Sequence, residues 1–543
     1  MADSQKRMLF AIITSFLFLM VWSKYFGPKP VQQPSQKQAV LDEKETVEKT
    51  PEPLQKQVIE EKPAQSIATE KVFVQFDALN AALNNHQGVV DHVTLHNYKQ
   101  TNAKDSVGVH VVPLALEATP PMVWSWDVNH VNQTYRFDDQ KVVYEWIERG
   151  ENSVYRLRSN QGPLEIEKTY TFDPSTYQIH HKVLLRNTSQ DRLIVSAKTK
   201  LEATRDPEKE SKGGFFALFQ APKTPVRAIV DIDDEANRYT LQKISKKDFT
   251  LPQGTIDWAG FESQYFLLAL RPQEALWSSL ELQGDTEEKA QIQYVYAERE
   301  IKPQSSISFE VAMYAGPKDI GILTGVDETL REAIDLGSWL GPIARVILKT
   351  LRLLYNWFGN YGWAIILLTV IVRLIMFPLA QKQAKSMKKM QVHKPAMDAL
   401  KEKHGENREE YSRALMEYMR THRINPAGGC LPLLIQFPIF IALYRVLYNS
   451  IELRHAPFIL WIKDLSAHDP YFVLPALVGI TFFFQTKLNP TPISDPTQAA
   501  MMKFMPVMFS VLMIFLPSGL NLYIFISTLW GIVQQYWVQQ SKA

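Results

Sequence analysis

The sequence predicts a multi-domain membrane protein with six transmembrane helices, a large all-β domain between the first two of them, and a helical hairpin after the second. Apolar segments long enough to cross a bilayer gather toward the two ends of the 543-residue chain. Through the middle, apolar residues alternate with polar ones, as in half-buried strands. A basic segment of helical period follows the second apolar segment and predicts the hairpin.

Residues 1–26 predict a signal anchor. Lys6 and Arg7 precede the apolar run MLFAIITSFLFLMVW, and the following SKYFGPKP lacks a small-x-small cleavage site. A cleaved signal peptide is the alternative. The two basic residues place the N-terminus in the cytoplasm. Residues 27–66 are rich in Pro, Gln, Lys and Glu, which cannot bury enough apolar surface to fold, and so predict a flexible linker.

Residues 67–336 predict a large antiparallel β-sandwich, which an N-in anchor places outside the cytoplasm. Two consecutive strands, LEIEKTYTF and YQIHHKVLLRN, flank the turn residues Asp173-Pro174-Ser175. Their alternation assigns to the inner face Leu164, Ile166, Tyr170, Phe172, Tyr177, Ile179, His181, Val183 and Leu185. The absence of a distinct carboxylate or metal-ligand cluster favours a scaffold or docking role for this domain.

Residues 337–356 predict an amphipathic helix that lies in the membrane surface, because they are too charged to cross it. One face carries Arg345, Lys349 and Arg352. The other face carries Ile343, Ile347, Leu351 and Leu354. The alternative is a soluble helix that packs on the sandwich.

Five further spans are predicted at 357–379, 427–449, 470–487, 500–516 and 519–537. With the anchor they make six, so both termini share one side of the membrane. The two longer loops differ in their lysine and arginine content. Segment 450–469 has only Arg454 and Lys463, whereas segment 380–424 has Lys382, Lys385, Lys388, Lys389, Lys394, Lys401, Lys403, Arg408, Arg413, Arg420 and Arg423. The asymmetry places 380–424 in the cytoplasm and 450–469 outside. The loop 488–499 and the tail 538–543 are then cytoplasmic.

Segment 380–424 predicts a helical hairpin with its turn at Gly405-Glu406-Asn407. An apolar stripe in the two arms consists of Met387, Met390, Met397, Leu400, Tyr411, Ala414, Leu415, Tyr418 and Met419. The stripe is either the core of the hairpin or an adaptable apolar surface. The basic outer face suits anionic lipid or ribosomal RNA.

No catalytic chemistry is evident. The sequence lacks the GxxxxGK[ST], GxGxxG, GxSxG and HExxH motifs. His180 and His181 point to opposite faces of a strand, and the single cysteine, Cys430, allows neither an internal disulfide nor a cysteine-based metal site. We therefore expect no catalytic residue, no metal and no cofactor.

Arg373, within TVIVRLIMFPL, is the exceptional residue of the predicted spans. An arginine inside a bilayer costs roughly 3 kcal/mol. It lies about 24 Å of helix from Trp357, in the inner half of the bilayer. It either snorkels to the inner surface or faces a hydrated cavity. Polar residues of other spans favour the cavity, as do the prolines expected to interrupt the helices: Thr369, Gln436, Asn521, Ser527 and Thr528, with Pro432, Pro438, Pro475 and Pro506.

Four stretches resemble the YidC-type membrane protein insertases of Gram-negative bacteria, the YidC/Oxa/Alb family. They are IVRLIMFPL, INPAGGCLPLLIQFPIFIALY, APFILWIKDLSAHDPYFVLP and FMPVMFSVLMIFLPSGLNLY, and the likeness covers about 340–537. The resemblance implies an inner-membrane protein with a five-helix insertase core and a periplasmic supersandwich. It implies insertion and folding of nascent membrane proteins from ribosome–nascent chain complexes into the phospholipid bilayer, alone or with the Sec translocon and its accessory subunits.

The resemblance also implies a hydrophilic groove within the membrane, open to the cytoplasm and the lipid. The residues that it assigns to the groove or to client contact are Arg373, Thr369, Gln436, Phe437, Phe440, Asn521 and Tyr523. The SGLNLY stretch departs from some relatives at Asn521 and Ile524. The ending QQSKA carries no long basic tail, so we expect ribosome contact through the hairpin and the loop 488–499 instead.

The sequence argues against two other functions. A solute transporter with a ligand-binding outer domain would show repeated halves, which this sequence lacks. An envelope enzyme acting on glycan through the sandwich would need a carboxylate constellation that the sequence does not display.

Overall fold

The computed structural model describes residues 71–84, 89–101, 106–112, 122–128, 143–148, 153–161, 163–204, 226–252, 256–273, 277–286, 289–337, 340–404, 407–422, 424, 431–488 and 496–540. They belong to one compact unit, Ala68–Ala543. The predicted anchor 1–26, the predicted linker 27–66, most of the loop 488–499 and the end of the tail lie outside the described residues.

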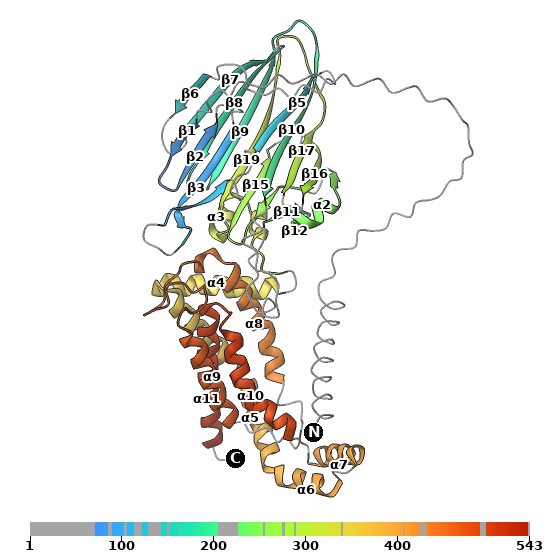
Figure 1. Ribbon diagram of the computed structural model, residues 1–543, viewed down its shortest axis with the longest axis vertical. Helices are drawn as coiled ribbons and strands as arrows, with labels where there is room; N and C mark the ends of the chain where they lie inside the picture. Colours follow the sequence, from blue (N-terminus) through green and yellow to red (C-terminus); the bar gives the residue numbers. More distant parts are fainter. Residues whose placement is uncertain are drawn as a thin grey trace, which may run out of the picture. The chain divides into compact units, whose positions relative to one another are not determined.

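The N-terminal half of the described chain is built from three antiparallel sheets (Figure 1). The first has the order β1 (Lys71–Gln75), β2 (Leu79–Asn84), β3 (Val89–Lys99), β4 (Gly108–Val112). The second has the order β13 (Phe249–Pro252), β16 (Trp277–Thr286), β17 (Lys289–Tyr296), β10 (Leu193–Thr204), β18 (Arg299–Ile301), with β5 (Met122–Val128) also paired to β10.

The third sheet is the largest and carries the residues discussed below. Its order is β12 (Glu235–Thr240), β11 (Arg227–Ile232), β14 (Ala259–Glu262), β15 (Phe266–Pro272), β19 (Ser306–Pro317), β9 (Gln178–Asn187), β8 (Leu164–Asp173), β7 (Ser153–Gln161), β6 (Val143–Glu148). Three short helical segments accompany the sheets, namely α2 (Leu241–Lys246), α3 (Ile320–Val326) and η4 (Thr329–Ala333). The predicted β-rich domain is confirmed.

The alternation read from the sequence is confirmed in β8 and β9. Burial alternates residue by residue along β8, and His181 is buried while His180 is exposed. The His181 ring stacks on Tyr170 at 4.2 Å between centroids, and its Nδ1 accepts a hydrogen bond of 3.0 Å from Trp124 Nε1. His181 is therefore a core residue. The unexpected member of the buried face is Lys168, whose pKa is lowered to about 7 by burial.

The C-terminal half is helical. Its elements are α4 (Gly341–Phe358), α5 (Tyr361–Val392), α6 (Lys394–His404), α7 (Arg408–Thr421), α8 (Leu431–Asn449), η6 (Ile451–Leu453), α9 (Val473–Leu488), α10 (Pro496–Met513) and α11 (Ser518–Gln540). Helix α11 packs on α5 and α9, α9 packs on α10, and α4 packs on α5 and α8 (Figure 1). Helix α6 packs on α7.

One segment of the described helices, Tyr361–Gln381, is long and apolar enough to cross a membrane. Two shorter apolar segments are Val473–Leu488 and Phe504–Met513. The count of six spans stays a prediction. The expectation that prolines interrupt the helices is wrong for α8 and α10, which continue through Pro438 and Pro506, and α5 likewise continues through Pro378.

The second predicted span begins later in the structure than the sequence suggested. Gly359 ends α4 with a φ of +65°, and its N–H donates to the Tyr355 carbonyl. The Asn360 side chain then accepts hydrogen bonds from the N–H groups of Gly362 (2.8 Å) and Trp363 (3.3 Å) and so starts α5. The predicted start at 357 therefore falls inside α4. At the other end α5 runs on to Val392, so the two hairpin helices are α6 and α7.

Helix α4 is amphipathic, and Ile347, Leu351 and Leu354 of the predicted apolar face are buried. Ile343 is exposed, because the buried stripe is centred on Ala344, Ile347, Leu348 and Leu351. Arg345 pairs with Glu332 at 3.2 Å, and Arg352 pairs with Asp319 at 3.3 Å and with Glu452 at 3.8 Å. Two of the three basic residues are thus engaged by neighbouring segments of the chain.

Glu452 should make stability depend on pH. Burial, followed by the nearby Asp319 carboxylate, raises the pKa of Glu452 to about 7 from 4.5. The folded protein then binds a proton between these pH values that the unfolded chain releases. The resulting stability is complete below about pH 4.5 and is lost as the pH rises through about 7. Glu452→Gln should therefore stabilise the protein at pH 8, by on the order of 2–3 kcal/mol, and much less at pH 5.

Thermal unfolding midpoints of the two full-length proteins at pH 5 and pH 8, at matched salt, check this expectation. Equal midpoints at pH 8 would contradict a neutralised Glu452.

The hairpin stripe is confirmed where its side chains are described. Tyr411, Ala414, Leu415, Tyr418 and Met419 are all partly buried, and residues between them are exposed. The side chain of Met387 lies outside the described part. Asn407, at the predicted turn, caps α7 through hydrogen bonds from the N–H groups of Glu409 (3.2 Å) and Glu410 (3.3 Å).

Candidate functional site: a polar cluster among helices α5, α8 and α11

Arg373 is held by α11. Its Nε donates a 2.9 Å hydrogen bond to Ser527 Oγ, and a terminal guanidinium nitrogen donates to the same oxygen. Ser527 is buried, and Arg373 is partly buried. The arginine therefore points toward a neighbouring helix, and this contact favours the inward-facing alternative over snorkelling.

A third helix extends the cluster. The Gln436 amide of α8 donates to the Tyr523 hydroxyl of α11. Tyr523 lies four residues before Ser527, so both side chains occupy one face of α11, and Tyr523 lies within electrostatic reach of Arg373. Three predicted site residues thus come together: Arg373, Gln436 and Tyr523.

Acidic residues are missing from the sequence of the predicted spans around Arg373. None of the five predicted spans after residue 357 contains Asp or Glu. Among the described residues, no carboxylate pairs with Arg373, whereas Arg445, in the third predicted span, pairs with Asp335 at 3.2 Å. Within the described part of the chain, the guanidinium therefore has a hydroxyl partner and no paired carboxylate.

The later start of α5 shortens the stretch of helix between its first residue and Arg373. Counted from Tyr361, Arg373 lies about 18 Å along the helix. The guanidinium also bonds to Ser527, so it is not extended toward a headgroup.

Two predicted site residues do not join the cluster. Thr369 is fully buried, and its hydroxyl donates to the Ile365 carbonyl of its own helix at 2.7 Å. Asn521 is also fully buried, and its amide donates to the carbonyls of Met513 (2.9 Å) and Leu516 (3.3 Å). The Asn521 amide therefore pairs with backbone carbonyls at and after the end of α10, and its role is local to the α10–α11 turn.

The two predicted phenylalanines lie on α8 beside Gln436. Phe437 is 59% exposed, and Phe440 is partly buried against the core. Further exposed apolar side chains occur on α9 and α10, namely Ile480, Phe483, Phe484, Phe504, Val507, Met508 and Val511. An apolar surface of this kind suits a lipid environment better than water.

Ser527 is the partner that the sequence reasoning did not select. In the sequence it is one of several polar residues of the last predicted span. Its spacing of four from Tyr523 was the available signal, because residues four apart share a helix face.

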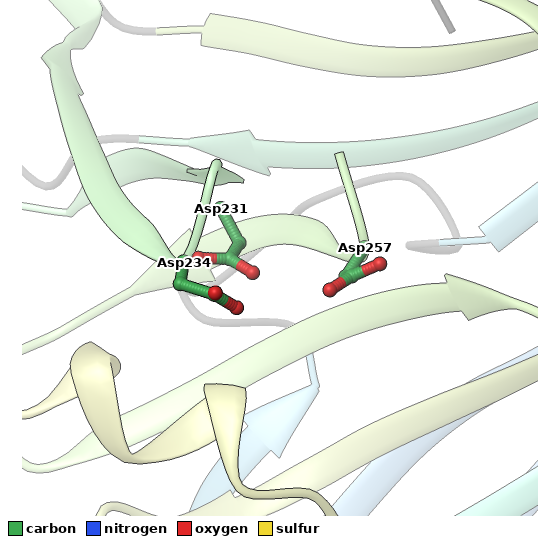
Figure 2. A group of neighbouring side chains, drawn as sticks. All are labelled: Asp231, Asp234 and Asp257. Atoms are coloured by element: carbon green, nitrogen blue, oxygen red, sulfur yellow. The ribbon is translucent and has the colours of Figure 1, made fainter. Parts of the chain in front are cut away.

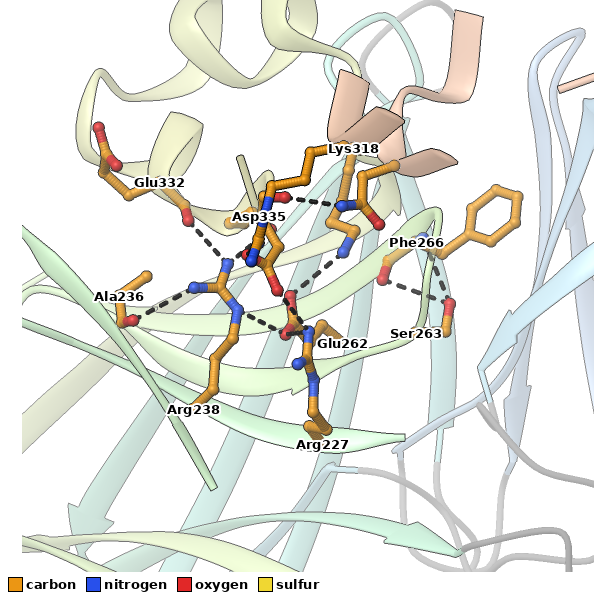
Figure 3. Close-up of polar contacts among 12 residues, drawn as sticks. Arg227, Ala236, Arg238, Glu262, Ser263, Phe266, Lys318, Glu332 and Asp335 are labelled. Atoms are coloured by element: carbon orange, nitrogen blue, oxygen red, sulfur yellow. Dashed lines mark hydrogen bonds and ion pairs between the residues drawn. The ribbon is translucent and has the colours of Figure 1, made fainter. Parts of the chain in front are cut away.

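A second polar cluster joins the β-rich domain to the helices (Figure 3). Glu262 of β14 is fully buried and bonds to Arg227 (2.7 Å), Arg238 (2.8 Å) and Lys318 (3.2 Å). Asp335 follows η4 and pairs with Arg227 at 3.5 Å. We call these five residues the Glu262 network.

The Glu262 network continues into α8. Asp335 pairs with Arg445 at 3.2 Å, and its carbonyl accepts a 2.7 Å hydrogen bond from the Asn449 side chain. Gln264 donates to the Tyr448 carbonyl at 2.8 Å. The outer end of α8 is therefore fixed to the β-rich domain by side-chain contacts as well as by the chain.

Two family models together cover nearly all of the described chain. The model for the 60Kd inner membrane protein matches residues 353–543, and the model for the YidC periplasmic domain matches residues 71–350. The chain is 32% identical over 557 residues to the membrane protein insertase YidC of Syntrophus aciditrophicus, a match that covers 98% of this chain and 99% of the relative.

A second relative has the same description. The membrane protein insertase YidC of Citrifermentans bemidjiense is 37% identical over 394 residues, covering 73% of this chain and 71% of the relative. A crystal structure described as an active YidC insertase with the first transmembrane domain resolved is 19% identical over 88% of this chain and 94% of that chain, with a TM-score of 0.39.

The β-rich domain, the apolar helices and these sequence matches define a membrane-integral protein insertase with a periplasmic domain. The chain belongs to the YidC family of membrane protein insertases.

Proposed function

We propose that this insertase receives the polar flank of a nascent membrane protein in a hydrated groove beside Arg373, Gln436 and Tyr523. The observation that carries the proposal is the position of Arg373, which is partly buried, bonded to Ser527, and without an acidic partner in the five predicted spans. A positive charge placed there attracts water and the acidic residues of a crossing segment.

Such a groove would shorten the distance that the polar segment crosses in hydrocarbon without water. Each unpaired backbone group of a translocating segment costs several kcal/mol in hydrocarbon. A groove that reaches the bilayer centre lets these groups keep water for part of the crossing. The apolar part of the client then leaves along the exposed apolar surface that begins at Phe437.

We extend the proposal to topology and partners. Six spans, cytoplasmic termini and a periplasmic supersandwich at 67–336 fit the basic loop 380–424 and the match to the YidC periplasmic domain. Nascent chains arrive from the ribosome at the cytoplasmic side. Larger clients are handled together with the Sec translocon and its accessory subunits. The groove contacts carried forward as a proposal are Arg373, Gln436, Phe437, Phe440 and Tyr523, with Thr369 and Asn521 as supports.

A photoreactive phenylalanine analogue at position 437 tests the route. It should crosslink to the polar flank of a stalled nascent client. The same analogue at Ile375, which is 72% exposed on α5, provides the control. Equal crosslinking from both positions, or none from 437, would exclude the groove as the route.

The hairpin α6–α7 should act in recruitment. Removing residues 394–421 and joining the ends with a short Gly-Ser linker should slow client capture several-fold, because the basic face and the apolar stripe are lost together. Capture is measured as early crosslinks from position 437. Water accessibility of the groove should be unchanged, and its loss would instead indicate a structural role for the hairpin.

A further inference from the structure

Three aspartates meet at the edge of the largest sheet (Figure 2). Asp231 lies at the end of β11, Asp234 lies in the turn to β12, and Asp257 lies just before β14. One carboxylate oxygen from each lies within 4.8 Å of the others. Asp231 and Asp234 belong to one hairpin and Asp257 to a later segment, so the fold brings the third aspartate to the other two.

Backbone pairing explains why the three converge. Strands β11 and β12 form a hairpin whose two turn residues, Asp233 and Asp234, have φ values of +52° and +61°. Asp231 is paired with Ala236 across this hairpin, and the turn brings the Asp234 carboxylate near that of Asp231. The Asp231 N–H donates to the Trp258 carbonyl at 3.0 Å, which brings the neighbouring Asp257 beside it.

The strongest indication of a bound cation is that the Asp231 carboxylate is buried without hydrogen bonds within the described part of the chain. It is fully buried, and neither of its carboxylate oxygens has a hydrogen-bond partner among the described residues. A buried carboxylate without hydrogen bonds is costly unless a cation or a proton compensates it. Burial and the charges of Asp257 and Asp234 raise the pKa of Asp231 to about 7.

The surroundings leave the three charges uncompensated. The two other nearby acids are already paired, Asp327 with Arg271 at 2.6 Å and Glu332 with Arg345 at 3.2 Å. No cation of the described residues pairs with Asp231, Asp234 or Asp257.

We propose that Asp231, Asp234 and Asp257 form a calcium site in the β-rich domain. Calcium takes oxygen ligands at 2.3–2.6 Å, so two ligands on opposite sides of one ion lie up to about 5 Å apart, which matches the spacing here. Asp234 and Asp257 are exposed, which leaves water access for the remaining ligands of a six- to eight-coordinate ion. An extracytoplasmic site of this kind binds at roughly 0.1–1 mM.

Terbium luminescence tests the proposal on the full-length protein in lipid nanodiscs after treatment with EDTA. Trp258 adjoins Asp257 and can sensitise a bound Tb³⁺. We expect a saturable signal that Ca²⁺ displaces at millimolar concentration and Mg²⁺ displaces much less well. Asp257→Asn and Asp234→Asn alter exposed side chains and should each weaken binding about tenfold or more.

Asp233→Asn is the matched control, because Asp233 is exposed in the same turn but outside the group. It should keep wild-type affinity. A signal that survives unchanged in Asp257→Asn, equal displacement by Mg²⁺, or equal loss in the Asp233→Asn control would overturn the proposal.

Discussion

Arg373→Ala should reduce insertion of a small client with an acidic translocated flank by about tenfold or more, whereas Arg373→Lys should retain most activity. The alanine variant removes the only charge of the polar cluster, and a charged hydrogen bond contributes roughly 1.5–3 kcal/mol. Lysine keeps the charge and loses the planar fork that bonds to Ser527. Pulse-labelling followed by protease protection in cells depleted of the wild-type protein measures the effect.

The choice of client sharpens this test. A matched client with neutral residues in the same flank gains little from the positive charge, so Arg373→Ala should affect it least. Equal loss for both clients would show that Arg373 stabilises the helix packing and does not attract the flank. Arg373→Lys reports on the same point, since a role confined to the Ser527 hydrogen bonds would make both substitutions equally harmful.

Glu262→Gln should lower the thermal unfolding midpoint of the full-length protein by about 10 °C. The substitution preserves shape but leaves Arg227, Arg238 and Lys318 around a neutral amide. Removing one partner of a buried ion pair typically costs about 3–5 kcal/mol. Each kcal/mol lowers the unfolding midpoint by about 2–4 °C in a domain of this size. Tryptophan fluorescence on heating provides the measurement.

Glu310→Gln provides the control for that experiment. Glu310 pairs with Lys182 on the surface, where an ion pair contributes at most about 1 kcal/mol. The unfolding midpoint of the Glu310→Gln variant should stay within about 3 °C of that of the wild type. A similar small shift for Glu262→Gln would mean that the Glu262 network contributes little to stability.

The pH dependence gives an independent check of the Glu262 network. Burial alone would raise the pKa of Glu262, but Lys318, Arg238 and Arg227 outweigh it and hold the pKa below 4.5. The stability that this carboxylate provides is therefore present above about pH 4.5 and is lost as the pH falls through the lower folded-state pKa. Glu262→Gln should lack this part of the acid sensitivity.

The sequence predicted the features that follow from local periodicity. The alternation in β8 and β9 and the opposite faces of His180 and His181 depend on residues close together in the chain. The boundary between α4 and α5 was also readable, because Gly359 and Asn360 are a helix C-cap and N-cap in succession. The apolar character of Trp357 and Phe358 obscured it.

Long-range polar contacts were not predictable in the same way. Ser527 meets Arg373 across 154 positions, and Asp335 meets Arg445 across 110. Nothing in local sequence specifies which helix faces pack together. The same reason explains Thr369 and Asn521, whose polar side chains suggested a groove, although the Thr369 hydroxyl and the Asn521 amide nitrogen each donate to a nearby backbone carbonyl.

The central claim is a hydrated groove beside Arg373, and thiol accessibility in intact membranes tests it most directly. Cys430 is first replaced by Ser, and single cysteines are introduced at Gln436 and at Ile375. Of the two side chains that are replaced, Ile375 is more exposed than Gln436. Ile375 lies two residues after Arg373, however, so it points to the opposite face of α5. With a membrane-impermeant thiol reagent on the cytoplasmic side, the cysteine at 436 should react readily and the one at 375 should stay unmodified. Reaction at 375 with an inert cysteine at 436 would contradict the groove.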